Sequence, residues 1–286
     1  MGKYLSFNGR ILEEQLPLVS ASNRGLRYGD GLFETMKLIR GEIRLAPLHF
    51  DRLFRGLSLL RFDIPAFFSA ESITADILRL CQKNKCTDAA RIRLSVFRGN
   101  GGLYDAENLL PNLLIQAWPL EEHRMVLNSN GLRMDVYSLA RKSCDVFAGL
   151  KTNNYLPSIM AALYAKEKRL NDCFLLNTWD RICDASIANV WWVRNGHIFT
   201  PPLSEGAVAG VMRQYLLQEA GRPGTGLFIT EQPLQPDELE QADEVFLTNA
   251  ISGIRWVQSY RQKDYGNQLA TTLFNQFVQP LNHSRE

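Results

Sequence analysis

The sequence predicts an α+β protein with two domains. At 286 residues the chain is longer than one hydrophobic core usually supports. In the first 117 residues, alternating apolar segments separated by short turns, which are typical of strand hairpins, stand beside two segments with helical spacing of apolar residues. The second half mixes the same two patterns, and no internal repeat is visible, so a solenoid is not expected.

The first domain is assigned to residues 1–117. Its two expected helices run from Pro47 to Leu60, where a proline stands near the first turn, and from about Glu71 to Asn84. Loops rich in Ser, Asn and Gly are expected at residues 20–31 and 98–102. The expected strands are Lys3–Phe7, a short strand after the turn Asn8-Gly9, Phe33–Ile39, Glu42–Leu45, Arg91–Phe97 and Leu113–Ala117.

Residues 118–125 are expected to link the domains, because Trp118-Pro119 and the charged Glu121-Glu122 interrupt the strand pattern. The second domain then spans residues 126–286. Helices are expected from Pro157 to Arg169 and from about Gly210. The expected strands are Leu132–Val136, Cys173–Leu176, Val190–Val193, His197–Thr200 and Glu244–Thr248.

The charge balance argues for a small-molecule partner. The 32 basic and 30 acidic residues are spread along the chain, so no basic run predicts nucleic-acid or membrane binding. The four histidines lie far apart without the spacing of metal ligands, and metal catalysis is not expected.

The cysteine pattern predicts a cytoplasmic protein. Five cysteines at irregular spacings fit a reducing compartment better than a disulfide framework. No apolar run approaches the roughly 20 residues needed to cross a bilayer, and the first residues lack the pattern of a signal peptide.

Two segments imitate phosphate-binding loops without fulfilling their requirements. Gly99–Tyr104 has a tyrosine where a dinucleotide fingerprint needs its third glycine. In Gly149-Leu150-Lys151-Thr152 a leucine separates the glycine and the lysine that a P-loop needs side by side. A Gly-x-Ser-x-Gly elbow is also missing, so these enzyme classes are not predicted.

A pyridoxal 5′-phosphate (PLP) enzyme needs a lysine for a Schiff base, an acid facing the pyridine nitrogen and donors for the phosphate. The sequence offers these residue types in ordered motifs that resemble the class IV aminotransferases, the fold type IV PLP enzymes, over residues 20 to 258. The motifs are Tyr28–Glu34, His49–Leu53, Lys151–Pro157, Asp184–Val190 and Gly210–Arg213.

The resemblance implies roles around the cofactor ring. Lys151 would carry the cofactor and, once freed by a substrate amine, move a proton. Asp184 would face the ring nitrogen, although the family usually has Glu there, and Glu205 is the alternative acid. Asn189 closes the acid motif and is assigned to cofactor binding, and the hydroxyl of Tyr155 would lie near the phenolic oxygen.

The phosphate would be held at three places. By resemblance Arg52 supplies a planar guanidinium for the dianion. Val211 and Met212 would donate backbone N–H groups at a helix start, where the dipole favours an anion. Asn249 and Ala250 occupy the stretch in which the aminotransferase branch often has a phosphate-binding Thr.

The resemblance also implies the architecture and the assembly. A small N-terminal α/β domain would precede a larger C-terminal domain with a β-barrel-like core. Family members are homodimers with the active sites near the interface, so a homodimer is expected here.

Within the family, the sequence favours the branch of 4-amino-4-deoxychorismate lyase, which makes 4-aminobenzoate and pyruvate for folate. The loop Arg98–Gly102, the position of Tyr155 and the pair Asn249-Ala250 resemble that branch, whereas Leu103 replaces its usual Arg. The alternative is an aminotransferase for branched-chain or D-amino acids with 2-oxoglutarate.

The substrate is expected to be a small amine, with Tyr28 beside it. Arg91 and Arg93 alternate with Ile92 on one strand face and would hold its carboxylates. A remote alternative is a non-catalytic binding protein with the PLP fold. Its sequence mark would be a lost lysine, and Lys151 is present.

Overall fold

The computed structural model describes residues 2–283 and divides the chain into two compact units. The first unit contains the chain up to Glu122 together with Leu150–Asn154. The second contains His123–Gly149 and the chain from Tyr155 onward. The chain therefore leaves the first unit within the expected linker, and the segment with Lys151 groups with the first unit.

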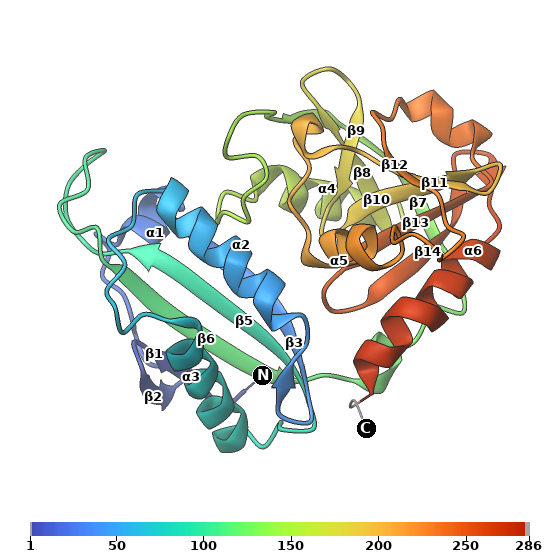
Figure 1. Cartoon of the computed structure of the whole chain (residues 1–286). Helices are drawn as coiled ribbons and strands as arrows, with labels where there is room; N and C mark the ends of the chain where they lie inside the picture. The colour runs from blue at the N-terminus through green and yellow to red at the C-terminus, as the bar shows by residue number, and fades with distance from the viewer. Residues whose placement is uncertain (1, 284–286) are drawn as a thin grey trace. The chain divides into compact units, whose positions relative to one another are not determined.

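The first unit is a six-stranded sheet with helices on one face (Figure 1). The strand order is β2-β1-β6-β5-β3-β4, and all neighbours are antiparallel. The strands are β1 (Tyr4–Phe7), β2 (Arg10–Glu13), β3 (Gly31–Ile39), β4 (Glu42–Ile43), β5 (Ala89–Arg98) and β6 (Pro111–Pro119). The helices are α1 (Arg24–Tyr28), α2 (Ala46–Leu59) and α3 (Ala70–Lys83).

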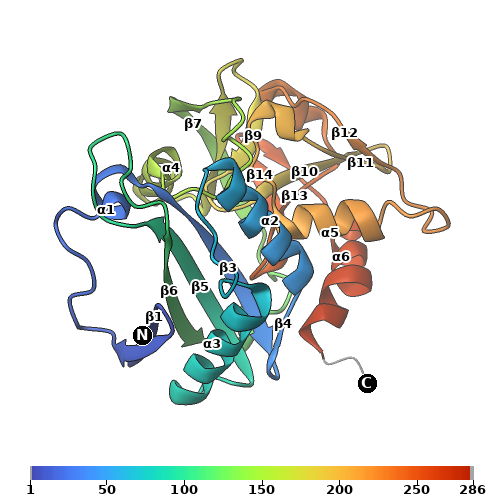
Figure 2. The ribbon, with the colours of Figure 1, turned by 60° about the vertical axis from the view of Figure 1, so that its left-hand side comes forward.

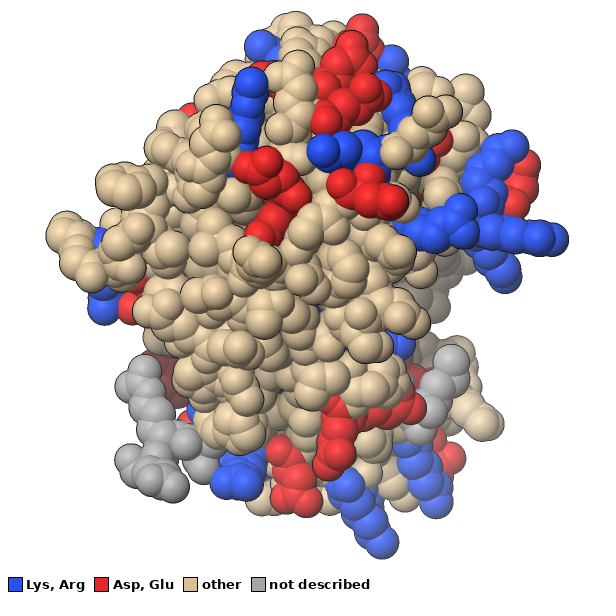
Figure 3. Space-filling view, turned by 90° about the vertical axis from the view of Figure 1, so that its right-hand side faces the viewer, with Lys and Arg blue, Asp and Glu red and all other residues tan. Residues whose placement is uncertain are grey.

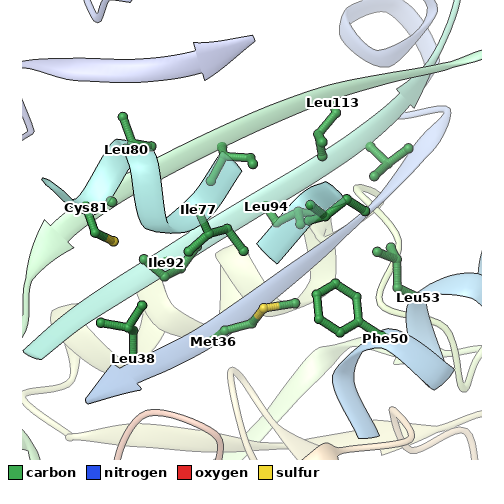
Figure 4. Packing of buried hydrophobic residues seen from close by; sticks show 14 of the residues in the cluster. Met36, Leu38, Phe50, Leu53, Ile77, Leu80, Cys81, Ile92, Leu94 and Leu113 are labelled. Atoms are coloured by element: carbon green, nitrogen blue, oxygen red, sulfur yellow. The ribbon is translucent and has the colours of Figure 1, made fainter. Parts of the chain in front are cut away.

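The core of this unit lies between α2, α3 and one face of the sheet. Figure 4 shows Phe50 and Leu53 of α2 facing the strands near Met36, and Ile77 of α3 packing above Ile92. Alternate residues of β3 and β5 belong to this core, so the residues between them form the opposite, open face. On this open face Arg91 is exposed, whereas Phe33 and Lys37 are buried.

The segment around Lys151 extends the sheet beside the start of β3. The Phe33 N–H donates to the Lys151 carbonyl at 2.9 Å, and the Asn153 N–H donates to the Gly31 carbonyl at 3.0 Å. A Cβ added to Gly31 would meet the carbonyl oxygen of Val96 at 2.3 Å, so only glycine permits this close packing. The lysine is fixed by backbone pairing on a rigid strand.

The second unit is built on a curled mixed sheet, seen from another side in Figure 2. Its path is β12-β11-β10-β13-β14-β7-β8-β9, with β15 attached to β14. The strands are β7 (Leu132–Lys142), β8 (Asp172–Asn177), β9 (Ile182–Ala185), β10 (Asn189–Arg194), β11 (His197–Thr200), β12 (Ile229–Glu231), β13 (Glu244–Asn249), β14 (Gly253–Tyr260) and β15 (Lys263–Asp264). The α-helices are α4 (Leu156–Glu167), α5 (Val211–Glu219) and α6 (Gln268–Leu273). Short 3-10 and π turns complete it: η1 (Glu122–Arg124), η2 (Leu203–Glu205), η3 (Pro236–Gln241), η4 (Phe274–Val278) and η5 (Gln279–Asn282).

Strand β8 is buried along its whole length because both of its faces are covered. Cys173 and Leu175 pack with Ala161 and Ala165 of α4, whereas Phe174 belongs to the core on the other face of the sheet. A parallel neighbour, β7, and an antiparallel one, β9, complete its hydrogen bonding. This arrangement explains the nearly continuous apolar run in the sequence.

The structure confirms the expected α+β class and adds elements that the pattern did not reveal. The loop expected at residues 20–31 contains α1, which begins at Asn23 with a side-chain cap and ends at Gly29 with a φ of 66°. Strand β7 runs six residues beyond the expected Val136. The strand β9, the hairpin β14–β15 and α6 were not expected, because each is short or lies beyond the last matched motif.

Candidate functional site

Lys151 lies beside the ring of Phe33 on the first unit. Its Nζ atom is 4.4 Å from the ring centroid, and the guanidinium of Arg93 is 4.1 Å from the same centroid. Phe33 stands on the open face of the sheet, since its neighbours Leu32 and Met36 both face the core. The open face therefore presents a half-buried amine next to a second cation.

Arg91 and Arg93 stand on the same open face, as the alternation predicted. They pair across to Lys37 and Thr35 of β3, so Lys37 lies on this face too. Burial, and then the neighbouring charge of Arg44, lower the pKa of Lys37 to about 8. A row of basic groups of this kind suits an anion with more than one carboxylate.

Arg52 makes a buried ion pair with Glu34 that the sequence did not predict. Its Nε donates to Oε1 at 2.7 Å and its Nη2 to Oε2 at 2.5 Å, a two-pronged contact. His49 adds a contact from Nδ1 to Oε2 at 2.7 Å. The three side chains are at most 8% exposed, so this network joins α2 to β3 inside the unit.

The network fixes the charge states of its members. Burial raises the pKa of Glu34, but Arg52 and His49 outweigh burial and lower that pKa to about 2. Burial lowers the pKa of His49, so the imidazole is neutral near pH 7. Its Nε2 is buried and has no hydrogen-bond partner within residues 2–283.

Tyr28 ends α1 and lies in a polar and aromatic cluster of the first unit. The guanidinium groups of Arg24 and Arg27 are each 5.1 Å from its ring centroid, and the ring of Tyr104 is 6.1 Å away. Arg24 also donates to the carbonyls of Leu103 and Tyr104, so it shapes the loop that the lyase motif begins.

Arg98, the first residue of that loop motif, has a structural role. Its guanidinium is 7% exposed, is ion-paired with Asp30 at 3.0 Å and donates to the carbonyls of Leu60 and Arg61. The motif therefore fixes the loop, and Leu103 and Tyr104 at its tip are exposed.

Asp184 lies at the centre of a hydrogen-bond network in the second unit. It is 3% exposed. Its Oδ2 accepts from Lys142 Nζ at 2.5 Å and from the Val208 N–H at 2.9 Å, and its Oδ1 accepts from Asn189 Nδ2 at 2.8 Å. Tyr155, at the start of α4, is close enough to affect Lys142 electrostatically.

Asn189 connects this acid to the start of α5. Its Nδ2 also donates to the Val208 carbonyl at 2.8 Å, and a Cβ added to Gly210 would lie 1.8 Å from its Oδ1. Gly210 is required because any side chain would displace Asn189. The first N–H groups of α5, those of Val211 and Met212, have no side-chain cap, so they suit an anion.

Two further residues, Asn249 and Arg213, have structural partners. The Asn249 side-chain oxygen accepts from the N–H groups of Ile251 and Ser252, which fixes the turn at Ala250. Arg213 of the helix-start motif binds Glu231 and the Pro201 carbonyl.

The alternative acid, Glu205, is paired with other side chains. Its Oε2 lies 2.8 Å from Arg181 and accepts from Asn177 at 2.7 Å. Asp184 therefore fits the ring acid better than Glu205 does, because its contacts with Asn189 and the Val208 N–H connect it to the start of α5.

The sequence did not single out Lys142, Glu34 or the Val208 N–H. Lys142 reaches Asp184 because β7, β8 and β9 are neighbours in the sheet, and no local spacing encodes that order. Glu34 is the last residue of the matched motif Tyr28–Glu34. A charged residue in an otherwise apolar strand is the sequence signal that could have indicated a buried ion pair.

The first unit contains a lysine paired onto a strand, and the second contains a buried carboxylate and an uncapped helix start. These are residue types that a PLP enzyme needs. The residues present fit this cofactor, since no side chain caps the start of α5, which could therefore bind a phosphate, and Oδ1 of Asp184 accepts from Asn189 with an acceptor position left for a ring nitrogen. The chain belongs to the amino-transferase class IV family, whose profile matches residues 31–260. This family uses pyridoxal 5′-phosphate.

Relatives at low identity carry the names of three activities: branched-chain-amino-acid aminotransferase, aminodeoxychorismate lyase and D-alanine aminotransferase. A protein of Methanocaldococcus jannaschii, provisionally named a branched-chain-amino-acid aminotransferase, is 31% identical over 86% of this chain and 84% of its own length. The aminodeoxychorismate lyase of Bacillus subtilis is 28% identical over 91% of this chain and 88% of its own. The crystal structure of a branched-chain aminotransferase from Thermoproteus uzoniensis matches with a TM-score of 0.87 at 23% identity, over 99% of this chain and 97% of that one.

Other kinds of site were also considered. Within residues 2–283, no helix is long and apolar enough to cross a membrane. In the same range, His, Cys, Asp and Glu side chains form no group of three that could hold a metal ion. Figure 3 shows one face on which basic and acidic side chains are interleaved around an uncharged middle.

Proposed function

We propose that this protein is a PLP-dependent aminotransferase that exchanges an amino group between a branched-chain amino acid and 2-oxoglutarate. The observation that carries this proposal is Lys151, whose main chain is hydrogen-bonded to β3 and whose side chain is bordered by the basic open face of the first sheet. A 2-oxo dicarboxylate needs two cationic contacts, and Arg91 and Arg93 supply them from alternate positions of one strand.

Each residue has a proposed task. Bound cofactor would supply an electron sink for the carbanion that forms when the substrate loses its α-proton. Lys151 would bind the cofactor and, when released, carry the proton from the α-carbon. Asp184, oriented by Asn189, would accept a hydrogen bond from the ring nitrogen, and Tyr155 would bind near the phenolic oxygen.

The phosphate would be held by Arg52, by the N–H groups of Val211 and Met212 and by the turn at Asn249 and Ala250. Two guanidinium nitrogens of Arg52 already bind Glu34, so the ion pair would orient this arginine. The helix start would add a dipole directed at the anion. Tyr28 would lie at the substrate side of the first unit.

Two observations support the aminotransferase over the lyase branch, which the motifs favoured. The relative at 31% identity belongs by name to the branched-chain aminotransferases. Arg98 binds Asp30 and the Leu60 carbonyl inside the first unit, and its loop ends at the exposed Leu103. The loop motif that suggested a lyase therefore adds no cation for the substrate of a lyase.

Aminodeoxychorismate lyase is the second candidate. Its support is the Bacillus subtilis relative at 28% identity, together with the basic pair Arg91 and Arg93, which would also suit a substrate with two carboxylates. The lyase would act in a folate pathway of the cytoplasm and would need no 2-oxo acid.

One preparation tests both candidates. We expect glutamate to form when a panel of branched-chain and D-amino acids is supplied with 2-oxoglutarate, and no pyruvate to form from 4-amino-4-deoxychorismate alone. Pyruvate and 4-aminobenzoate released without an acceptor would instead assign the lyase. Omission of 2-oxoglutarate from the first assay is the control.

We also propose a homodimer, and α4 carries the argument. Leu156, Ile159, Met160 and Leu163 recur at helical spacing and are 67%, 53%, 41% and 55% exposed; we call them the α4 stripe. The opposite face of α4 is already buried through alanines such as Ala161. A helix that is apolar on both faces is expected to be covered, and a second copy of this chain would cover it.

We expect the pair of substitutions Ile159→Glu and Leu163→Glu to convert a dimer into a folded monomer of about 32.5 kDa. Both side chains are exposed within one chain, so the change costs little stability there, whereas two charges buried in an interface would cost several kcal/mol. Light scattering after gel filtration measures the mass. Ala162→Glu, also exposed on α4, is the matched control. A wild-type monomer, or a mutant dimer, would contradict the proposal.

A further inference from the structure

The side chain of Lys142 is an ionised group beside the proposed ring acid, although none of the matched motifs contains it. Lys142 ends β7, and its ammonium lies 2.5 Å from Oδ2 of Asp184. The two side chains are 16% and 5% exposed. Charges so far removed from water interact more strongly than charges at the surface.

The donors around Asp184 fix the orientation of its carboxylate. An ionised carboxylate offers about four acceptor positions. Lys142 and the Val208 N–H occupy Oδ2, and Asn189 occupies one position of Oδ1. These donors come from three separate segments, so the carboxylate is held rigidly and Oδ1 keeps room for one further donor.

The charges of the pair compensate each other. Burial alone would lower the pKa of Lys142, but the charge and the hydrogen bond of Asp184 outweigh burial and raise it. Burial raises the pKa of the Cys183 thiol to about 12, so this neighbour adds no charge near pH 7. Lys142 is therefore a cation that pairs with the Asp184 carboxylate.

We propose that Lys142 is a positioning residue that limits how strongly Asp184 holds a proton on the ring nitrogen of the bound cofactor. This inference rests on the proposed function. A carboxylate that shares its charge with an ammonium stabilises a protonated ring less than an isolated carboxylate does. The ammonium is in addition a like charge, which disfavours a cationic ring nearby. The strength with which the bound cofactor would withdraw electrons therefore depends on Lys142 and Asp184 together.

The test measures the protonation of the ring directly. Wild type, Lys142→Met and Lys142→Arg are reconstituted with PLP labelled with ¹⁵N in the ring, and the ¹⁵N chemical shift is followed against pH. We expect the deprotonation midpoint to rise by about one pH unit or more in Lys142→Met. Lys142→Arg should restore the wild-type midpoint, and Lys168→Met, an exposed lysine at the end of α4, is the control. An unchanged or lower midpoint in Lys142→Met would overturn the inference.

A second measurement needs no cofactor. The thermal midpoints of the apo forms of Lys142→Met, Asp184→Asn and the double mutant give the coupling between the two residues. We expect the double mutant to regain most of the loss seen in Lys142→Met, because it leaves no uncompensated buried charge. Additive losses would show that the pair is not coupled and would contradict the inference.

Different results would overturn the proposed function and the role of Lys142. A wild-type protein that takes up no PLP would overturn the proposed function and the role of Lys142 with it. Normal uptake with the same ¹⁵N midpoint in wild type and Lys142→Met would overturn the role of Lys142 alone.

Discussion

Lys151→Ala is expected to abolish both the covalent attachment of the cofactor and turnover. The variant loses the amine that would bind the cofactor and carry the substrate proton, and a lost proton carrier alone costs about 10²- to 10⁴-fold. Lys151 is half-buried and its main chain carries the pairing to β3, so the side chain can be removed without breaking the sheet.

Borohydride reduction of the wild type followed by peptide mapping tests this assignment. A pyridoxyl group is expected on Lys151. Lys166→Ala, an exposed lysine of α4, serves as the control and should keep full activity. A pyridoxyl group on any other lysine would refute the assignment.

Arg52→Ala is expected to destabilise the first unit as well as to weaken cofactor binding. Without Arg52, the side chain of Glu34 keeps its contact with His49 but is only 1% exposed, and breaking a buried ion pair costs about 3–5 kcal/mol. The lost contact to the phosphate adds about 1.5–3 kcal/mol to cofactor dissociation. Denaturant unfolding of the apo protein and cofactor titration separate these two effects.

Arg55→Ala is the matched control for Arg52→Ala. Arg55 lies on the same helix and makes an exposed i,i+4 pair with Asp51, which contributes little. Wild-type stability of apo Arg52→Ala would contradict the buried network. Unchanged cofactor affinity in Arg52→Lys, which keeps the charge but loses the fork, would move the phosphate site elsewhere.

The stability of the protein at acid pH is an independent test of the network of Glu34, Arg52 and His49. The pKa of Glu34 is lowered from 4.5 to about 2, so its stabilisation is complete above pH 4.5 and is lost as the pH falls toward 2. The shift corresponds to at most about 3 kcal/mol. Glu34→Gln should remove this part of the acid dependence of unfolding.

Much of the fold and of the site could be predicted from local patterns. The amphipathic spacing around Leu53 predicted α2 to within one residue at each end, and the alternation around Ile92 placed Arg91 and Arg93 on one face of β5. The ordered motifs led to the family, because each combines a reactive residue with the turn or helix start that presents it.

Other features depended on long-range pairing. The short helix α1 lies in a polar loop and is stabilised by its caps, and strand β9 is stabilised by pairing with β8. Neither element produces a local periodicity of apolar residues in the sequence. The branch of the family is also not decided by the motifs, since the loop beginning at Arg98 resembles a lyase feature while the guanidinium of Arg98 binds Asp30.

Residue types at fixed spacing along the chain were enough to predict the family and the α+β architecture, and they led to the proposal that Lys151 binds the cofactor. Which charges compensate each other depends on the tertiary structure. Glu34 meets Arg52 across a strand–helix contact, and Lys142 meets Asp184 because β8 lies between β7 and β9. Electrostatic interactions depend on distance in space and on burial, and both are set by the packing of segments that are remote in sequence.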